Sequence, residues 1–155
     1  MKKLTPLRKL FKSKKSRSEE KHHNEHSPNQ SNPFKDRIQN EMHKGKEILI
    51  ANLSDLNVAN MISMATRVKD IIRQENKPMR LLVIFNKKNY ATPKFIRHAE
   101  QLNKEWEHLV EKQAVIGLNK VKLFILKGFN LALKKKISAF ETLEEAKEFL
   151  VSEEP

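Results

Sequence analysis

Three short runs of consecutive apolar residues constrain the fold of this chain more than any other feature of its sequence. They occupy residues 48–51, 81–85 and 114–116, and polar or turn-forming residues bound each of them. Between the runs, apolar residues recur every three or four positions, which is the period of an amphipathic helix. Strands that are apolar on both faces and alternate with helices are typical of a parallel sheet covered by helices. The chain therefore predicts an α/β domain.

The remaining signals predict the element order ββαβαβαβα. A weak strand at about 36–42 precedes a turn at Lys44 and Gly45, so we expect it to pair antiparallel with the strand at 47–52. Helices are expected at 58–75, 93–109, 120–133 and 143–150, with a last short strand at 137–140. Each helix follows a residue suited to N-capping, namely Asn57, Thr92, Asn119 and Thr142. The fold class predicted is a mainly parallel sheet with one antiparallel edge strand and helices packed on it.

The first 33 residues differ in composition from the rest. Residues 1–17 carry eight basic side chains and no acidic one, within a chain whose formal net charge is +12. Residues 12–33 contain no aliphatic or aromatic side chain, so this segment cannot bury enough apolar surface to offset its ordering entropy. We expect residues 1–33 to form a basic, disordered tail and tether, residues 34–151 the folded domain, and residues 152–155 a C-terminal end.

The tail carries a narrow apolar stripe at helical spacing. Its members are Leu4, Leu7, Leu10 and Phe11. Basic amphipathic segments bind anionic membranes, so residues 1–17 are a candidate for peripheral membrane contact. An unstructured solubilising tail is the more favoured interpretation. Nucleic acid is the least favoured partner, because no aromatic side chain other than Phe11 lies among these charges.

Composition also argues against several kinds of chemistry. The chain has no cysteine, which excludes disulfides and cysteine-based zinc or thiol chemistry, and its three glycines leave no phosphate-binding loop. No secretory signal or run of about 20 apolar residues is present, so we expect a cytoplasmic protein. The acids of the domain fall on expected solvent faces, and no serine or threonine has a base in a recognised turn motif. We therefore expect no enzyme, no metal site and no cofactor.

Three segments resemble a known family. They are residues 48–56 (ILIANLSDL), 112–118 (KQAVIGL) and 137–150 (ISAFETLEEAKEFL). These are similar to the SpoIIAA-like branch of the STAS superfamily, which includes domains of sulfate transporters and anti-sigma-factor antagonists. The resemblance covers residues 34–151. It implies a compact sheet with helices on its faces, working by protein–protein or small-ligand contact rather than by catalysis.

Phosphorylatable members of that superfamily carry an Asp-Ser-Ser-Gly-like segment at the start of the helix after a central strand. The matching residues here are 89–93 (NYATP), which offer one hydroxyl, that of Thr92, with no acidic neighbour and no following glycine. A threonine before a proline at the first helical position is also the ordinary pattern of a helix N-cap. Of these two interpretations, the phosphoacceptor role of Thr92 is the less favoured.

The helix expected at 120–133 is apolar on more than one side. We expect one face to contact the sheet, comprising Val121, Phe124, Ile125, Gly128 and Ala132. A second stripe comprises Leu123, Leu126 and Leu133. Either neighbouring helices cover this stripe, or it is a candidate surface for a protein partner or for a homodimer. The leading interpretation is thus a non-enzymatic interaction or regulatory domain. The alternative is a carrier or sensor of an apolar small molecule or lipid, which an apolar cavity between this helix and the sheet would favour.

Overall fold

A computed structural model of the chain describes residues 34–153, and the compact unit considered below begins at Asp36. Its elements are β1 (Ile38–His43), β2 (Lys46–Asn52), α3 (Val58–Glu75), β3 (Met79–Ile84), α4 (Pro93–Trp106), β4 (Val110–Ile116), α5 (Lys120–Leu131), β5 (Ser138–Phe140) and α6 (Leu143–Val151). The strands form one sheet in the order β1-β2-β3-β4-β5. Only the edge pair β1–β2 is antiparallel, and the other three pairs are parallel. The predicted fold class is confirmed.

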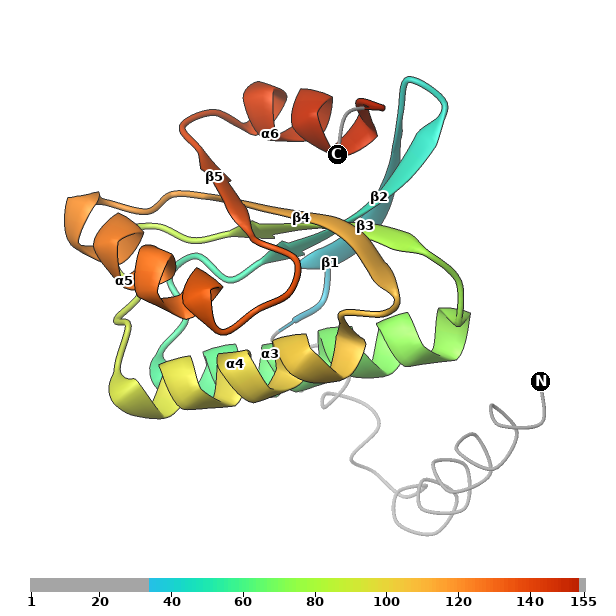
Figure 1. Cartoon of the computed structure of the whole chain (residues 1–155). Helices are drawn as coiled ribbons and strands as arrows, with labels where there is room; N and C mark the ends of the chain where they lie inside the picture. Colours follow the sequence, from blue (N-terminus) through green and yellow to red (C-terminus); the bar gives the residue numbers. More distant parts are fainter. Residues whose placement is uncertain (1–33, 154–155) are drawn as a thin grey trace, which may run out of the picture. The chain divides into compact units, whose positions relative to one another are not determined.

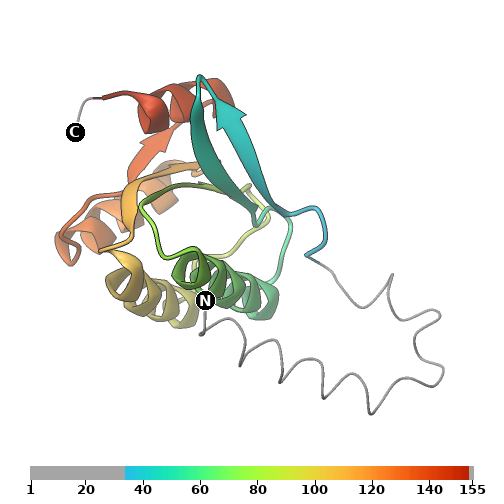
Figure 2. The same cartoon turned by 90° about the vertical axis from the view of Figure 1, so that its right-hand side faces the viewer.

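Helices lie on both sides of the sheet, with α6 on one side and α3 and α4 together on the other (Figures 1 and 2). The α6 side has a closed core in which Ala146 and Leu150 pack against Ile48, Leu82 and Ala114. Strand residues alternate between faces, so their neighbours Leu49, Leu81 and Val115 point to the opposite layer. Within residues 34–153, no helix combines the length and the apolarity needed to cross a lipid bilayer.

Local signals place most of the element boundaries. The side chains of the four expected N-caps each accept a hydrogen bond from a backbone N–H in the first helical turn. Lys44 and Gly45 have φ values of 50° and 80°, which is the left-handed pair that a two-residue hairpin turn requires. These local choices agree with the sheet topology, so the hairpin and the helices begin where the sequence predicts.

The beginning of β4 is different from the expectation. We expected a helix to run to about residue 109 and a strand at 114–116, but α4 ends at Trp106 and β4 begins at Val110. Three of the four added strand residues, Glu111, Lys112 and Gln113, are polar, and the first two find partners that are distant in sequence. Lys112 Nζ donates to the carbonyl oxygens of Phe149 and Ser152 at 2.8 and 3.0 Å, at the C-terminal end of α6. Glu111 pairs with Arg80 of β3 at 3.0 Å.

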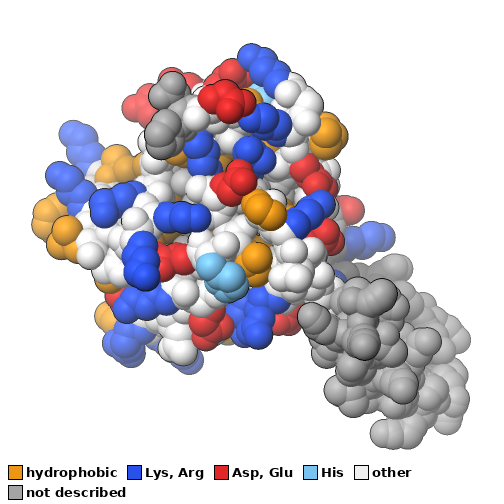
Figure 3. Space-filling view, turned by 45° about the vertical axis from the view of Figure 1, so that its right-hand side comes forward, with side chains coloured by type: hydrophobic (Ala, Val, Ile, Leu, Met, Phe, Trp, Pro, Cys, Tyr) orange, Lys and Arg blue, Asp and Glu red, His pale blue; other side chains and the backbone are white. Residues whose placement is uncertain are grey.

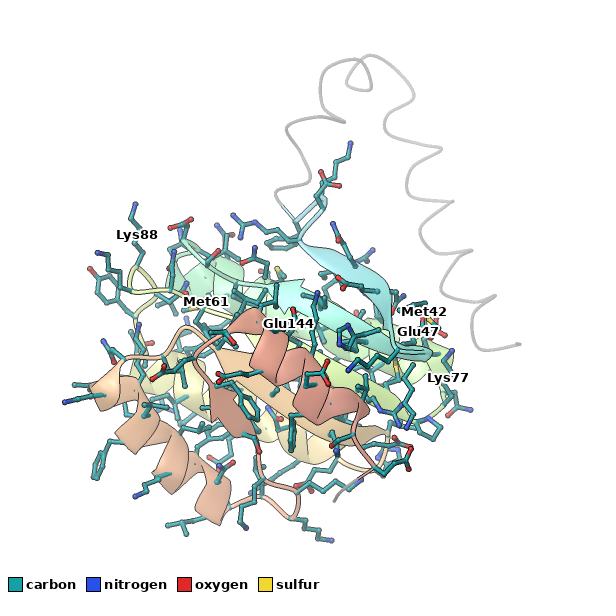
Figure 4. The ribbon with its side chains drawn as sticks, turned by 90° about the horizontal axis from the view of Figure 1, so that it is seen from above. Met42, Glu47, Met61, Lys77, Lys88 and Glu144 are labelled. Carbon is teal, nitrogen blue, oxygen red and sulfur yellow. The ribbon has the colours of Figure 1, made fainter. Side chains whose placement is uncertain are left out.

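Charged contacts fasten the turn end of the hairpin. Glu47 and Lys77 lie together at this end of the sheet, and Lys77 Nζ is 3.3 Å from Glu47 Oε1 (Figure 4). The hydrogen bond to Glu47, together with the negative charges of Glu47 and Glu75, raises the pKa of the Lys77 amine. The Lys77 side chain thus connects the residues just before β3 to β2.

Candidate functional site

An apolar cavity of about 140 Å³ lies between the sheet and the layer formed by α3, α4 and α5. Its floor includes Ala51, Val83 and Val115 from β2, β3 and β4. Met61 of α3 and Phe129 of α5 contribute to its walls. The cavity lies on the sheet face opposite to the closed core of α6.

Two features of the sequence leave this space unfilled. Alanine occupies inward positions on the surrounding elements, at Ala51, Ala65 and Ala99, where larger side chains would fill the cavity. In addition, α5 has no fully buried residue, although it is the most apolar helix among those described. Its inner residues Leu126 and Phe129 reach the cavity only with partly buried side chains. The α5 wall is therefore the least tightly packed part of the enclosure.

The buried and partly buried polar side chains around the cavity form hydrogen bonds within the protein. The indole N–H of Trp106 donates to Asn103 Oδ1 at 3.1 Å and to Gln113 Oε1 at 3.4 Å. Asn103 Nδ2 donates in turn to the carbonyl oxygen of Ala99 at 2.8 Å. Asn89 is buried and donates to the carbonyl oxygens of Leu53 and Leu56. Because these groups satisfy one another, the cavity offers an apolar ligand an environment with little unpaired polarity.

The cavity reaches the surface beside the loop between β3 and α4. Tyr90 of this loop lines the cavity and is exposed to solvent. Lys122 of α5 also lines it, and its Nζ donates to the carbonyl oxygen of Asn86 at 3.3 Å. A cation and a phenol thus stand where an apolar interior meets water. This arrangement suits an amphiphile whose polar end stays at the mouth.

Most of the residues assigned to the faces of α5 were placed wrongly, although Ile125 does line the space between α5 and the sheet. Phe124, expected against the sheet, is 76% exposed, and Val121 and Gly128 also face solvent. Leu133, expected in the outer stripe, is only 5% exposed, and Leu126 packs with it in a small core. Of the proposed partner surface only Leu123, at 40%, is exposed. The sequence could not decide between the faces, because a helix that is apolar on more than one side has no single apolar stripe.

Thr92 caps α4. Its Oγ1 accepts a hydrogen bond from the backbone N–H of Phe95 at 3.2 Å, and Pro93 follows at the first helical position. This geometry gives the hydroxyl a structural role, while the phosphoacceptor role stays a prediction. The tail stripe of Leu4, Leu7, Leu10 and Phe11 lies outside the described residues.

A cluster that the sequence analysis did not predict joins the hairpin to α6. His43, Glu144 and Glu148 bring ligand-type atoms within 4.8 Å of one another, a spacing that a divalent ion could bridge. Glu148 is already engaged, because His43 Nε2 and Lys44 Nζ each lie 2.9 Å from its carboxylate oxygens. The hydrogen bond from Lys44 and that from His43 lower the pKa of the Glu148 carboxyl. We assign to this cluster the structural role of holding the hairpin against α6.

Comparison with known proteins agrees with this architecture. The fold matches that of a solved protein from Shewanella loihica PV-4, described as an uncharacterized member of the DUF3478 family with a SpoIIAA-like fold. The TM-score is 0.56 at 14% sequence identity, and the match covers 73% of this chain and 91% of the other. The chain has a SpoIIAA-like fold.

The resemblance noted in the sequence is thereby confirmed at the level of the fold. No protein-family model matches the chain, and no curated protein matches it in sequence. A fold does not by itself specify a function, so the function has to be argued from the cavity and the surface.

Proposed function

We propose that the domain binds an apolar small molecule, or the apolar part of a lipid, in the cavity between the sheet and helices α3, α4 and α5. It acts as a carrier or sensor and not as an enzyme. The observation that supports this function is the cavity itself, which is apolar, about 140 Å³ in volume and open beside Lys122. We place this activity in the cytoplasm, with peripheral contact at membranes.

The size of the cavity bears on the ligand. An engineered cavity of about 150 Å³ lined by aliphatic and aromatic side chains binds benzene, so the present volume accommodates a group of that size. Burying the roughly 150–250 Å² of an aromatic group contributes about 4–6 kcal/mol, which is too little for tight binding. A tighter ligand has to bury a longer apolar segment. That segment needs more space, and α5 is the wall that moves with the smallest loss of packing.

Protein interaction is the second candidate function. It is favoured by the exposed apolar side chains on the outer side of α5, of which Leu131 and Phe124 are the most exposed. Native mass spectrometry of the protein as purified distinguishes the two candidates. A bound small molecule supports the carrier or sensor, whereas a dimer without one supports the interaction domain.

The cavity is tested by the fluorescence of Trp106, the one tryptophan of the chain, which lines it. We expect a brominated fatty acid to quench this fluorescence in the full-length protein. The variant Ala65→Leu places a larger side chain in the cavity and should lower the quenching at least about tenfold at subsaturating probe.

The matched control is Ala59→Leu, an exposed position on the same helix, which should be quenched like the wild type. Circular dichroism confirms that both variants are folded. Quenching of Ala65→Leu equal to that of Ala59→Leu would place the ligand elsewhere and reject the proposal.

A further inference from the structure

The segment that forms α5 and the turn after it is strongly basic. Residues 118–140 contain six lysines and no acidic residue, namely Lys120, Lys122, Lys127, Lys134, Lys135 and Lys136. All of them except Lys122 are exposed. Glu107 approaches the segment, where its Oε2 accepts a hydrogen bond from the backbone N–H of Lys134 at 2.7 Å. A cationic surface therefore surrounds the cavity wall formed by α5.

Large apolar side chains project from this cationic surface. The Leu131 side chain is 86% exposed, and that of Phe124 is 76% exposed. At about 100° per residue, Phe124 and Leu131 share the outward side of α5 with Lys120 and Lys127. Along the left edge of Figure 3, where α5 lies, orange hydrophobic side chains stand among blue Lys and Arg side chains. The outer side of α5 thus combines exposed apolar groups with positive charge.

We infer that the outer side of α5 docks on an anionic phospholipid membrane. Phe124 and Leu131 enter the boundary between headgroups and acyl chains, and Lys120 and Lys127 contact lipid phosphates. A helix lying in the membrane interface has this combination of an exposed apolar side and a lysine-rich border. The positive charge of this surface favours an anionic membrane over a second copy of the chain, because in a dimer the lysines of one copy would face those of the other. An anionic bilayer complements both the charge and the apolar side chains.

Membrane docking on this face would place the cavity next to lipid. The inner side of the same helix, with Leu126 and Phe129, forms the cavity wall, and Lys122 stands at the mouth. The inference goes beyond the proposed ligand binding, since it concerns the opposite side of the helix and needs no ligand in the cavity. Ligand binding and docking can therefore fail independently.

The test is co-sedimentation of the full-length protein with vesicles of phosphatidylcholine alone and of phosphatidylcholine with phosphatidylserine at about 7:3. We expect the wild type to bind the mixed vesicles more tightly. The variants Phe124→Ser/Leu131→Ser and Lys120→Gln/Lys127→Gln should each weaken that binding at least about tenfold. All four positions are exposed, so the melting temperature should stay close to that of the wild type.

Two matched controls remove similar groups elsewhere. Met42→Ser removes an exposed apolar side chain at the hairpin (Figure 4), and Arg67→Gln/Arg73→Gln removes two positive charges from exposed positions of α3. Both should bind mixed vesicles like the wild type, because they leave α5 unchanged. Every variant keeps the same N-terminal tail, so any contribution of the tail to binding is equal in all of them.

Equal binding by the α5 variants and their controls would overturn the inference, and so would a wild-type dimer that Phe124→Ser/Leu131→Ser converts to a monomer. Quenching of Trp106 by the brominated fatty acid, measured on the same proteins, should be unchanged. This second measurement separates failure of docking from failure of the cavity.

Discussion

At Gly117 the local structure requires a residue without a side chain. It follows β4 with a φ of 90°, and a Cβ at this position would overlap the carbonyl oxygen of Phe85. The backbones of β3 and β4 stay close here, where the N–H of Phe85 donates to the carbonyl oxygen of Ile116 at 3.0 Å. Gly128, which we expected to permit close approach of α5 to the sheet, has open space around it.

Substituting the two glycines by alanine should have opposite effects on the free energy of unfolding. Gly117→Ala should lower the free energy of unfolding by at least about 2 kcal/mol, because it adds both backbone strain and a steric overlap. Gly128→Ala should raise it by up to about 1 kcal/mol, since alanine favours the helix and meets no atom. Urea unfolding of both variants measures the difference. A stable Gly117→Ala would show that the strand end tolerates a side chain.

At the scale of the element, α5 differs from the other helices. Helices α3 and α4 each have fully buried side chains, whereas α5 has at most partly buried ones. Leu133, just after its C-cap, supplies the anchor by packing with Val115 and Ile137. Asn130 adds to this anchor, because its side chain exchanges two hydrogen bonds of 2.9 Å with the backbone of Ile137. α5 is thus secured mainly at its C-terminal end.

Lysine substitutions along α5 should follow the observed faces. Phe124→Lys should change the free energy of unfolding by no more than about 0.5 kcal/mol, because the side chain is exposed. Leu133→Lys should cost several kcal/mol, because it buries an unpaired charge. Leu126→Lys should fall between them, since Leu126 is partly buried at the cavity. Thermal unfolding of the three variants gives the order, and a Phe124→Lys variant as unstable as Leu133→Lys would contradict the assigned faces.

At the scale of the whole domain, charged contacts connect the hairpin to α6 across more than 100 residues of sequence. Glu148 of α6 bonds His43 and Lys44, and Lys147 bonds Glu41 of β1. Lys46 pairs with Glu153 at 2.8 Å, and this contact lowers the pKa of the Glu153 carboxyl. In Figure 4 the labelled Glu144 marks α6, which lies on the viewer's side of the sheet. The contacts reach the hairpin from this side. They fix the first and last elements of the domain to each other.

These contacts predict a dependence of stability on pH. The pKa of the Glu148 carboxyl lies below its ordinary value of 4.5, so its contribution is present above that value and is lost as the pH falls through the lower folded-state pKa. Glu148→Gln should therefore melt below the wild type at pH 7, and the two should converge at strongly acidic pH. Thermal melts across this range check the sign. A constant difference down to about pH 2 would show that charge is not the cause.

Much of the fold could be predicted because its signals are local. The apolar runs at 81–85 and 114–116 and the caps at Asn57 and Thr142 depend on neighbours in sequence, and so does the hairpin turn at Lys44. The polar start of β4 could not be predicted, because Lys112 is stabilised by carbonyl groups of α6. The cavity was foreseen only as an alternative, since it depends on how far α5 stands from the sheet.

The sequence by itself determined the order of elements, the α/β class and the antiparallel edge strand, because periodicity, caps and turns act within a few residues. Only the tertiary structure decided which side of α5 faces the sheet, because that helix is apolar on more than one side and its orientation follows from the burial of Leu133 and Leu126. It also decided that the alanines of three elements meet around one unfilled space. Such a cavity is a property of packing between distant segments, which no local pattern encodes.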